Sequence, residues 1–294
     1  MFVVLGATGH TGRAAAEALL AGGRGVVAVG RNPQKLQALA AKGAKTAAGD
    51  AFDPAFLTQV FQGAEGVYAL LPPDVTARDF LAHYDRAAQA IEKALKAAGV
   101  RRVVFLSSQG AQHKDGTGPI KALHAQEERF KALGLDLTIL RPGYFCENLF
   151  GSLPLIKHQG INGGAIAPGA RFNMIATADI GAFAASELVR SGASGLRLME
   201  LYGPRDYTMT EATRILGEAV GKPGLAYVHF PDADFKGALV QAGFSAHVAE
   251  LFAEMAHAIS DGLVSGTQPR TPANTGATAL EDFAPAFAQA YRAL

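Results

Sequence analysis

Several classes of protein are excluded by what this sequence lacks. Its 294 residues include a single cysteine and no tryptophan, and its 27 lysines and arginines are balanced by 26 aspartates and glutamates. One cysteine cannot form an intrachain disulfide, so a disulfide scaffold is excluded and a reducing compartment is favoured. A net charge of +1 provides no basic footprint for a nucleic acid or for an anionic membrane surface, so we expect neither partner.

Long hydrophobic runs are missing as well. Charged residues recur throughout, and no apolar run approaches the ~20 residues of a membrane span. The chain begins on an apolar segment with no basic segment before it, which argues against a secretory signal. Because 49% of the residues are hydrophobic, the chain can build a sizeable core. We therefore expect a soluble, cytoplasmic α/β protein with one large domain or two smaller ones.

The first 140 residues alternate short β-branched runs with longer alanine-rich segments, which is typical of a parallel sheet with crossover helices. The expected strands lie at residues 2–5, 25–30, 45–48, 66–71, 102–106 and 135–140. Asn32 and Asp53 each stand before a proline and are expected to cap the helices that follow. Repeated units of strand and helix predict an α/β fold with a Rossmann-type, doubly wound parallel sheet.

The second half has a different composition. Residues 160–169 are rich in glycine and alanine, and predict a loop over the edge of the sheet. Helices are expected at 178–189, 208–220, 232–242, 246–263 and 279–291, and strands at 196–202 and 225–230. We therefore expect an NAD(P)-binding domain over residues 1–150, with strands contributed by later segments. A smaller, mostly helical substrate-binding lobe is expected over residues 151–294, with strands at its edge.

The clearest motif is a glycine loop directly after the first expected strand: Gly6, Ala7, Thr8, Gly9, His10, Thr11 and Gly12. Its glycines allow a tight turn, close approach of a pyrophosphate and close packing of the next helix on the sheet. Free N–H groups at the start of that helix would face the phosphates. We expect all seven residues to bind a dinucleotide, with a purely structural turn as the alternative. We interpret His10 as the occupant of a variable position rather than as a catalytic base.

The end of the second expected strand indicates which cofactor is used. It reads Val29-Gly30-Arg31-Asn32, with no carboxylate to bind the ribose 2′-hydroxyl of NAD. Arg31 can hold a 2′-phosphate and stack on adenine, and Arg13 is a candidate to assist it. We therefore expect NADP(H) to be preferred over NAD(H); the alternative is that Arg31 is a surface arginine at a helix start.

Two further strand ends are expected to line the cofactor crevice. Asp50 follows the third strand, where it would either meet the adenine amino group or cap a helix. Leu70, Leu71 and Pro72 end the fourth strand, where they would lie beside the nicotinamide half or form a plain turn.

Other motifs join the glycine loop in resembling a known family. They are Ser107-Ser108, Leu140-Arg141-Pro142-Gly143-Tyr144-Phe145, Glu147-Asn148 and Ala178-Asp179-Ile180. Together they resemble the NmrA-like atypical short-chain dehydrogenases/reductases, and most of all the bacterial NAD(P)H:quinone oxidoreductases of that group. The resemblance covers nearly the whole chain, and the string from Arg141 to Asn148 is its most specific part.

The resemblance implies a Rossmann fold that holds NADPH and either transfers a hydride to a quinone or a similar flat electron acceptor, or senses NADP(H) without catalysis. The sensing alternative implies a regulatory protein partner, and a homodimer stays open for either. The implied cofactor contacts are the glycine loop, Arg31, Leu70, Leu71, Pro72, Pro142, Gly143, Tyr144 and Phe145.

One departure concerns the catalytic tyrosine and lysine of standard short-chain dehydrogenases. They would fall near residues 119 and 123, where this sequence has Pro119 and Leu123. Interconversion of alcohols and carbonyls loses its acid without them, whereas a quinone accepts a hydride readily once it is positioned. The catalytic residues are unknown. Lys121, His124 and Tyr144 are the candidates, and the first two equally fit a solvent-facing position.

The acceptor site is expected after the sixth strand. Tyr144 and Phe145 would form one wall of a flat aromatic site, or belong to the core, and Asn148 would bind a carbonyl oxygen or cap a turn. The histidines have no ligand spacing, so no metal is expected. Cys146 is interpreted as a packing thiol, and Glu127-Glu128-Arg129 as a solvated helix face.

Overall fold

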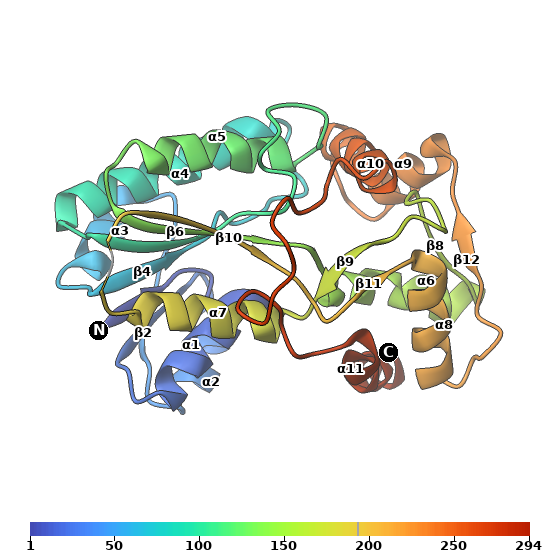
Figure 1. The fold of residues 1–294 in the computed structure, drawn as a ribbon, viewed down its shortest axis with the longest axis horizontal. Coiled ribbons are helices and arrows are strands. Elements are labelled where there is room, and N and C mark those ends of the chain that lie inside the picture. The colour runs from blue at the N-terminus through green and yellow to red at the C-terminus, as the bar shows by residue number, and fades with distance from the viewer. Residues whose placement is uncertain (193) are drawn as a thin grey trace.

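Seven parallel strands form the central sheet within residues 1–192 and 194–294, the part of the chain described by this computed structural model (Figure 1). They are β1 (Phe2–Val4), β2 (Val26–Gly30), β3 (Lys45–Ala48), β4 (Gly66–Ala69), β5 (Arg102–Leu106), β6 (Asp136–Pro142) and β10 (Leu196–Leu201). Their order is β10-β6-β5-β4-β1-β2-β3. The predicted doubly wound sheet is confirmed. Its order reverses at β1, because β2 and β4 lead away from it in opposite directions, and ligands bind at such a point.

Helices cover both faces of the sheet (Figure 1). One face carries α1 (His10–Ala21), α2 (Pro33–Ala40) and α7 (Thr177–Val189), and the other carries α3 (Pro54–Phe61), α4 (Phe80–Ala98) and α5 (Ile120–Lys131). Every residue of β1 and β4 is buried, as a parallel sheet between two helical layers requires. Asn32 and Asp53 cap α2 and α3 as predicted.

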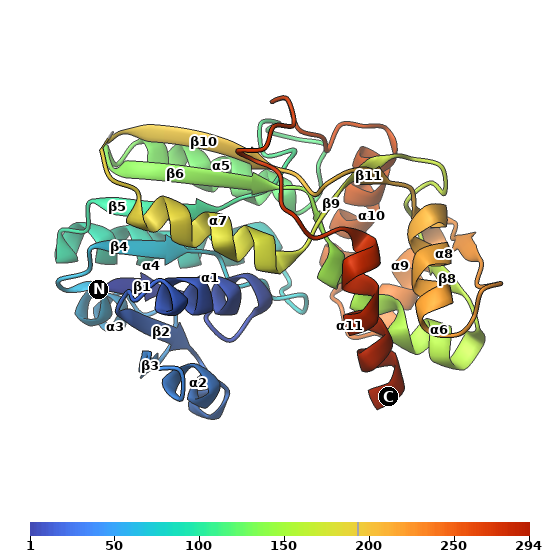
Figure 2. The ribbon, with the colours of Figure 1, turned by 60° about the horizontal axis from the view of Figure 1, so that its bottom comes forward.

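The rest of the chain forms a second lobe beyond the carboxyl ends of the strands (Figure 2). Its elements are β7 (Tyr144–Phe145), a 3₁₀ segment (Cys146–Ser152), α6 (Leu153–Gln159), β8 (Asn162–Gly164), β9 (Phe172–Ile175), β11 (Asp206–Tyr207), α8 (Met209–Ala219), β12 (Tyr227–His229), α9 (Asp232–Gln241), α10 (Ala246–Ser260) and α11 (Leu280–Ala293). The lobe is mostly helical, as predicted, and has its own core around Phe172, Tyr207 and Phe287. No helix in the described ranges has both the length and the apolar character that crossing a bilayer requires.

One expectation about this half is wrong in part. Residues 160–169 are not wholly a loop, because β8 pairs in parallel with β12. An Asn-Gly-Gly segment lacks the β-branched residues typical of strands, and its partner lies far along the chain. The strand predicted at 196–202 joins the central sheet, since β10 pairs with β6, in line with the expectation that later segments contribute strands to it.

The outer edge of β10 is covered by the chain between α10 and α11, which crosses the front of Figure 1. The fully buried carboxylate of Glu200 accepts hydrogen bonds from the backbone N–H groups of Thr267 and Gln268, each at 2.5 Å. The N–H of Tyr202 donates to the carbonyl of Asn274 at 2.9 Å. The side-chain amide of Gln268 also accepts from the N–H of Glu200 and donates to the carbonyl of Leu198, each at 3.2 Å, so this segment satisfies part of an edge that would otherwise be open to pairing.

Candidate functional site

The glycine loop lies at the carboxyl end of β1, beside the point where the strand order reverses. Gly6 has a φ of 61°, in the left-handed region. A Cβ on Gly12 would lie 2.3 Å from the carbonyl oxygen of Gly6, so only glycine lets α1 start this close to the strand. The N-cap of α1 is Gly9, which has no side chain to occupy the free N–H groups of the first turn. This cradle fits a pyrophosphate group.

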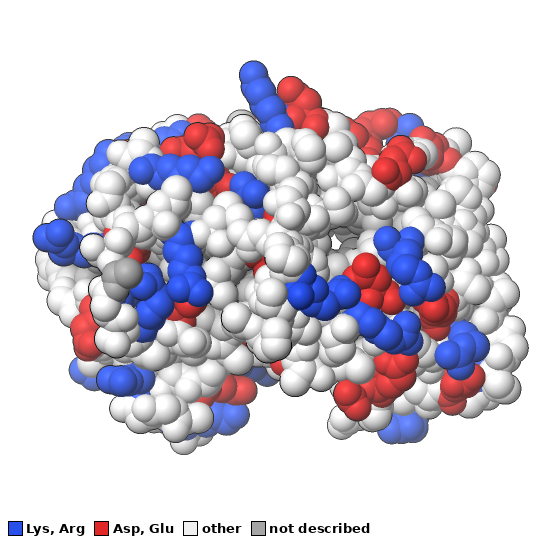
Figure 3. Space-filling model, viewed as in Figure 1, with Lys and Arg blue, Asp and Glu red and all other residues white. Residues whose placement is uncertain are grey.

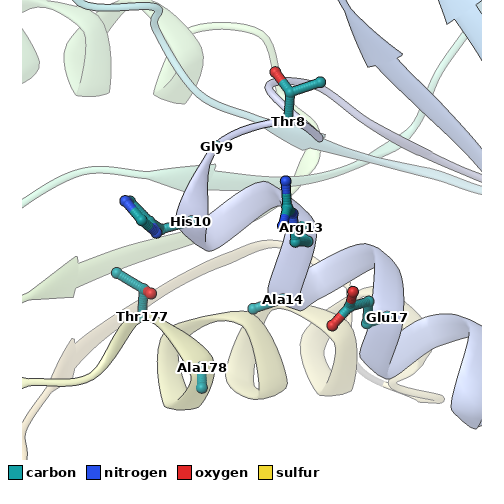
Figure 4. A pocket seen from close by; sticks show the side chains of 8 residues that line it. All are labelled: Thr8, Gly9, His10, Arg13, Ala14, Glu17, Thr177 and Ala178. Atoms are coloured by element: carbon teal, nitrogen blue, oxygen red, sulfur yellow. The ribbon is translucent and has the colours of Figure 1, made fainter. Parts of the chain in front are cut away.

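A cavity of about 220 Å³ opens along the first turns of α1 (Figure 4). Its lining residues are Thr8, Gly9, His10, Arg13, Ala14, Glu17, Thr177 and Ala178. His10 and Arg13 leave α1 in different directions in this view. The ring of His10 lies 6.3 Å from that of Phe150, so it points toward the second lobe. Arg13 extends toward Thr8.

The ends of β2 and β3 lie next to this loop. The N–H of Gly49 donates to the carbonyl of Gly30 at 3.2 Å, and a Cβ on Gly30 would come within 2.9 Å of Thr8 Cγ2. Arg31 and Asp50 are both exposed there. Arg31 therefore stands where a Rossmann fold places the adenosine ribose.

Asp50 does not cap a helix, so that alternative is wrong. Its Oδ1 accepts a hydrogen bond from the N–H of Phe52 at 3.1 Å, which forms a local turn. The cap of α3 is Asp53, whose Oδ1 accepts from the N–H groups of Ala55 at 2.8 Å and Phe56 at 3.2 Å.

The loop after β4 packs against the glycine loop on one side and against helix α4 on the other. Leu70 fills the space beside Gly6, because its methyl carbons lie 2.9 Å from where a Cβ would stand. Leu71 is buried, and the carbonyl oxygen of Pro72 lies 3.0 Å from His83 Nε2. Hydrogen bonds from the side chain and backbone of Thr76 hold the pKa of the Asp74 carboxyl below its usual range, with smaller contributions from the charges of His83 and Arg31. The loop therefore brings Asp74 close to Arg31.

The segment after β6 turns into the second lobe. The N–H of Gly143 donates to Leu201 O at 3.2 Å, and Pro142 O accepts from the N–H of Gln109 at 2.9 Å. Tyr144 and Phe145 then pair with β9. Neighbouring strand residues face opposite sides: Tyr144 lies 5.5 Å from the ring of Phe172 in the lobe, whereas Phe145 packs against the sheet face under α1 and α7. The two rings therefore do not form one shared wall.

The Tyr144 hydroxyl is a neutral group at ordinary pH. Burial, and secondarily the neighbouring Cys146, raise the pKa of Tyr144 to about 12. Burial also raises the pKa of the Cys146 thiol to about 12, so it lies in the core as an unreactive thiol. Asn148 is exposed on the 3₁₀ segment. The structure therefore packs the half-buried Tyr144 against the lobe core and leaves Asn148 exposed.

The other two catalytic candidates hold α5 to its surroundings. Lys121 Nζ lies 3.3 Å from Glu254 Oε2 on α10, and His124 Nδ1 lies 2.9 Å from the carbonyl oxygen of Ala111. Pro119 precedes the helix, and Leu123 packs against the core on that face. Helix α5 thus presents no tyrosine and lysine pair, and the polar groups nearest those positions are engaged with the protein.

A buried ionic network near this helix is missing from the sequence-based prediction. Glu127 is fully buried, and its carboxylate accepts from Arg141 Nε at 2.8 Å and Nη2 at 2.5 Å, and from Ser107 Oγ at 2.5 Å. The prediction of a solvated face is therefore wrong for Glu127. Its spacing, seven residues after Ile120 and three before Phe130, could have placed it on the buried stripe. Because Ser107 donates to Glu127, its proton is not directed at a substrate.

Glu147 is a second missed residue. Both of its carboxylate oxygens lie 3.0 Å from the N–H of Thr177, and Oε1 also accepts from the Thr177 hydroxyl at 2.5 Å. This carboxylate is favourably placed at the N-terminus of α7 and ties the 3₁₀ segment to that helix. A Ser, Thr, Asp or Asn before the helix would have signalled the cap, but Ala176 stands there.

Charged side chains do not form a patch of one sign on the face in Figure 3, where lysines and arginines lie beside aspartates and glutamates over both lobes. On this face, no extended basic surface adds to the favourable field for an anion at the N-terminus of α1.

Comparison with known proteins places these features in context. The family model described as NAD(P)H-binding matches residues 6–189. Quinone oxidoreductase 2 of Escherichia coli (strain K12) is 32% identical over 259 residues, which cover 86% of this chain and 86% of that protein. An NAD(P)H azoreductase of Xenophilus azovorans is 26% identical over 298 residues, covering 100% of both.

Solved structures agree with the fold. The crystal structure of an NADPH-dependent quinone oxidoreductase from Escherichia coli, complexed with NADPH, superposes with a TM-score of 0.80 at 27% identity, over 97% of this chain and 98% of that one. A triphenylmethane reductase from Citrobacter sp., complexed with NADP(H), gives a TM-score of 0.78 at 23% identity, over 98% and 100% of the two chains. The latter likeness concerns the fold alone.

Proposed function

The chain belongs to the NAD(P)H-binding, NmrA-like family of atypical short-chain dehydrogenases/reductases, and from this we propose its function. The proposed function is that of an NADPH-dependent reductase, which transfers a hydride to a quinone or to a similarly flat electron acceptor. The observation that carries it is the state of α5, where Lys121 and His124 are both engaged and no tyrosine and lysine pair is present. The relative named for quinone reduction, at 32% identity, supports the same reaction.

The cofactor is proposed to be NADPH rather than NADH. The end of β2 carries Arg31 and no carboxylate, which favours a 2′-phosphate over a free 2′-hydroxyl. An exposed guanidinium can bind a phosphate in two-pronged fashion at little desolvation cost. The NADPH complex of the Escherichia coli relative is in line with this preference.

We propose that different segments of the chain bind different parts of the cofactor and the acceptor. The loop from Gly6 to Gly12 holds the pyrophosphate on the N-terminus of α1, and Asp50 lies near the adenine. The nicotinamide half is bounded by the loop Leu70, Leu71 and Pro72 on one side and by Pro142, Gly143 and Phe145 on the other. Residues 1–150 thereby hold the cofactor, and the lobe at 151–294 selects the acceptor.

NADPH supplies the hydride when it is bound, and the protein orients the acceptor for it. Tyr144 is proposed to line the acceptor site from the lobe side, with Asn148 offering its amide to a carbonyl oxygen. The oxygen of a reduced quinone is only weakly basic, so water can protonate it and a dedicated acid is not required. Positioning then provides most of the rate enhancement.

The proposal is tested by mixing the purified protein with NADPH and a panel of benzoquinones and naphthoquinones, while the absorbance of the reduced cofactor is followed. The expected result is consumption of NADPH that depends on the acceptor. An azo dye is tested as a further acceptor, and a simple aldehyde serves as the negative control. Reduction of the aldehyde needs the proton donor that the missing tyrosine and lysine pair would supply, so the aldehyde should not react. A panel without any acceptor-dependent consumption would refute the reductase.

The same state of α5 favours a second candidate, a protein that senses NADP(H) without catalysis. A sensor would bind the oxidised and reduced cofactors with different affinities and would retain a protein partner in only one of those states. Calorimetry with NADP⁺ and NADPH, together with size exclusion in each state, separates the two candidates. Equal affinities and no state-dependent partner would argue against sensing.

A further inference from the structure

In the part of the chain that the structure describes, the side chain of Arg13 has no ionic or hydrogen-bonding partner. We propose that Arg13 determines cofactor specificity together with Arg31, and that the two guanidinium groups form a clamp for the phosphate on the adenosine ribose of NADPH. This inference rests on the proposed use of NADPH and adds a residue to it. It follows from the side of α1 that carries Arg13, from the pairing of the charges around it and from the cavity beside it.

The faces of α1 direct Arg13 toward β2 and α2. Thr11, Ala15 and Leu19 face the sheet and are buried. Ala14 faces α7, since a Cβ on Gly181 would lie 2.4 Å from its own Cβ. At 100° per residue, Arg13 therefore leaves the helix on the side away from α7. In Figure 4 its side chain extends toward Thr8, which in turn packs over Gly30 at the end of β2.

The natural helical partner of Arg13 is bound elsewhere. Glu17 stands four residues further along α1, at the spacing that usually forms a surface ion pair. Its Oε1 instead accepts a hydrogen bond from Lys42 Nζ at 2.8 Å, from the turn after α2. Within residues 1–192 and 194–294, the side chain of Arg13 makes no ion pair or hydrogen bond; only its backbone N–H is bonded, to Gly9 O at 3.0 Å. Arg13 is exposed at the rim of the 220 Å³ cavity between α1 and the start of α7, and no described group of the protein occupies its guanidinium donors.

The position of Arg13 points to the ribose phosphate rather than to the pyrophosphate. The pyrophosphate is expected at the free N–H groups of the first turn, whereas Arg13 ends that turn, its own N–H already donates to Gly9 O, and its side chain extends toward Thr8 on the β2 side (Figure 4). The ribose of a bound dinucleotide lies at the end of the second strand, where Arg31 stands. The charge of Arg31 is the smallest of the causes that lower the pKa of the Asp74 carboxyl, after the hydrogen bonds from Thr76 and the charge of His83. Arg13 adds a second positive charge, which forms no ion pair with a carboxylate of the described residues.

The test measures binding rather than turnover. The variants are Arg13→Ala and Arg13→Lys, with Arg86→Ala as the matched control, because Arg86 is also an exposed helical arginine but lies on α4, across the sheet. The dissociation constants for NADPH, NADH, 2′,5′-ADP and ADP are determined by calorimetry for each protein and for the wild type.

We expect Arg13→Ala to weaken NADPH and 2′,5′-ADP by about 10- to 100-fold, as the loss of a charge-assisted phosphate contact does, and NADH and ADP by less than about twofold. Arg13→Lys should fall between, because an ammonium keeps the charge but not the planar fork. Arg86→Ala should bind all four ligands as the wild type does.

An equal loss for NADPH and NADH would overturn the clamp, because Arg13 would then contact a group that both cofactors share. Unchanged affinities would overturn it as well, since the guanidinium would then be merely solvated. Failure of the reductase proposal is a separate result, visible as no acceptor-dependent consumption of NADPH by the wild type, and it leaves these binding ratios intact.

Discussion

The two ends of the sheet's carboxyl edge use charge in opposite ways. At the adenosine end, Arg13 and Arg31 are exposed. At the other end, Glu127 and Arg141 are buried and joined by hydrogen bonds of 2.8 and 2.5 Å. An exposed cation can bind an anionic ligand without a large desolvation cost, whereas a buried pair fixes the protein chain and has no capacity left for a ligand. The comparison suggests that cofactor recognition depends on accessible charge, and acceptor reduction on fixed geometry.

The largest effect is expected from breaking the buried pair. Glu127→Leu leaves Arg141 buried without its partner and should lower the free energy of unfolding by about 3–5 kcal/mol. Urea denaturation measures this change. The matched control is the double variant Glu127→Leu with Arg141→Met, which replaces both charges by apolar groups and should recover most of the loss. If Glu127→Leu is as stable as the wild type, the buried pair does not fix the protein chain, and the two ends of the sheet do not differ in their use of charge.

Closing the glycine cradle should affect both cofactors alike. Gly12→Val places side-chain atoms where a Cβ alone would lie 2.3 Å from the carbonyl oxygen of Gly6. The loop then cannot present its N–H groups, and the loss of two charge-assisted hydrogen bonds weakens NADPH and NADH by about 100-fold or more. Calorimetry gives both affinities. Gly22→Ala, at the far end of α1, is the control, because its Cβ would meet Ala18 O at an ordinary 3.5 Å. Retained affinity in Gly12→Val would show that phosphates bind elsewhere.

A smaller effect is expected at Tyr144 and should depend on the ring rather than on the hydroxyl. Tyr144→Ala removes the proposed aromatic contact and should lower kcat/KM for a naphthoquinone about tenfold, while Tyr144→Phe should stay within about threefold. Because the pKa of Tyr144 is raised to about 12, the wild-type rate should not follow titration of this hydroxyl near neutral pH. A strong loss in Tyr144→Phe would instead identify the hydroxyl as the proton donor.

The smallest effect concerns stability at alkaline pH. The pKa values of Tyr144 and Cys146 rise from ordinary values of 10.0 and 9.0 to about 12. The folded state therefore favours the neutral forms, and their contribution to stability is complete below pH ~9 and is lost as the pH rises toward ~12. Thermal unfolding should show a steeper fall in Tm from about pH 8 to about pH 11 for the wild type than for the variant Tyr144→Phe with Cys146→Ser. Identical slopes would contradict this assignment.

Much of the fold could be predicted because its signals are local. The strands at 45–48 and 102–106 coincide with β3 and β5, and the caps at Asn32 and Asp53 are those of the structure. β8 could not be predicted in the same way, because its hydrogen-bonding partner β12 is remote in sequence and its own residues are poor strand formers.

In the candidate site too, features with a local sequence signal could be predicted and features that depend on distant contacts could not. The glycine loop is a contiguous motif and was recognisable, whereas the pairing of Glu127 with Arg141 depends on how α5 docks on β6. The separation of Tyr144 from Phe145 follows from the alternation of side chains in a strand, once that segment is known to be a strand. Among the described residues, the side chain of Arg13 stays unpaired because Lys42, in the turn after α2, binds Glu17 on α1, and this contact between distant segments has no local sequence signal.

The most direct test of the contrast between the two ends is kcat/KM for NADPH and for NADH, with one naphthoquinone, in the wild type and in Arg31→Ala. The predicted result is that the wild type prefers NADPH and that Arg31→Ala reduces this preference about tenfold or more, while kcat at saturating NADPH stays unchanged. An equal loss with both cofactors, or a fall in kcat itself, would contradict the division between a charged cofactor end and a fixed reaction end.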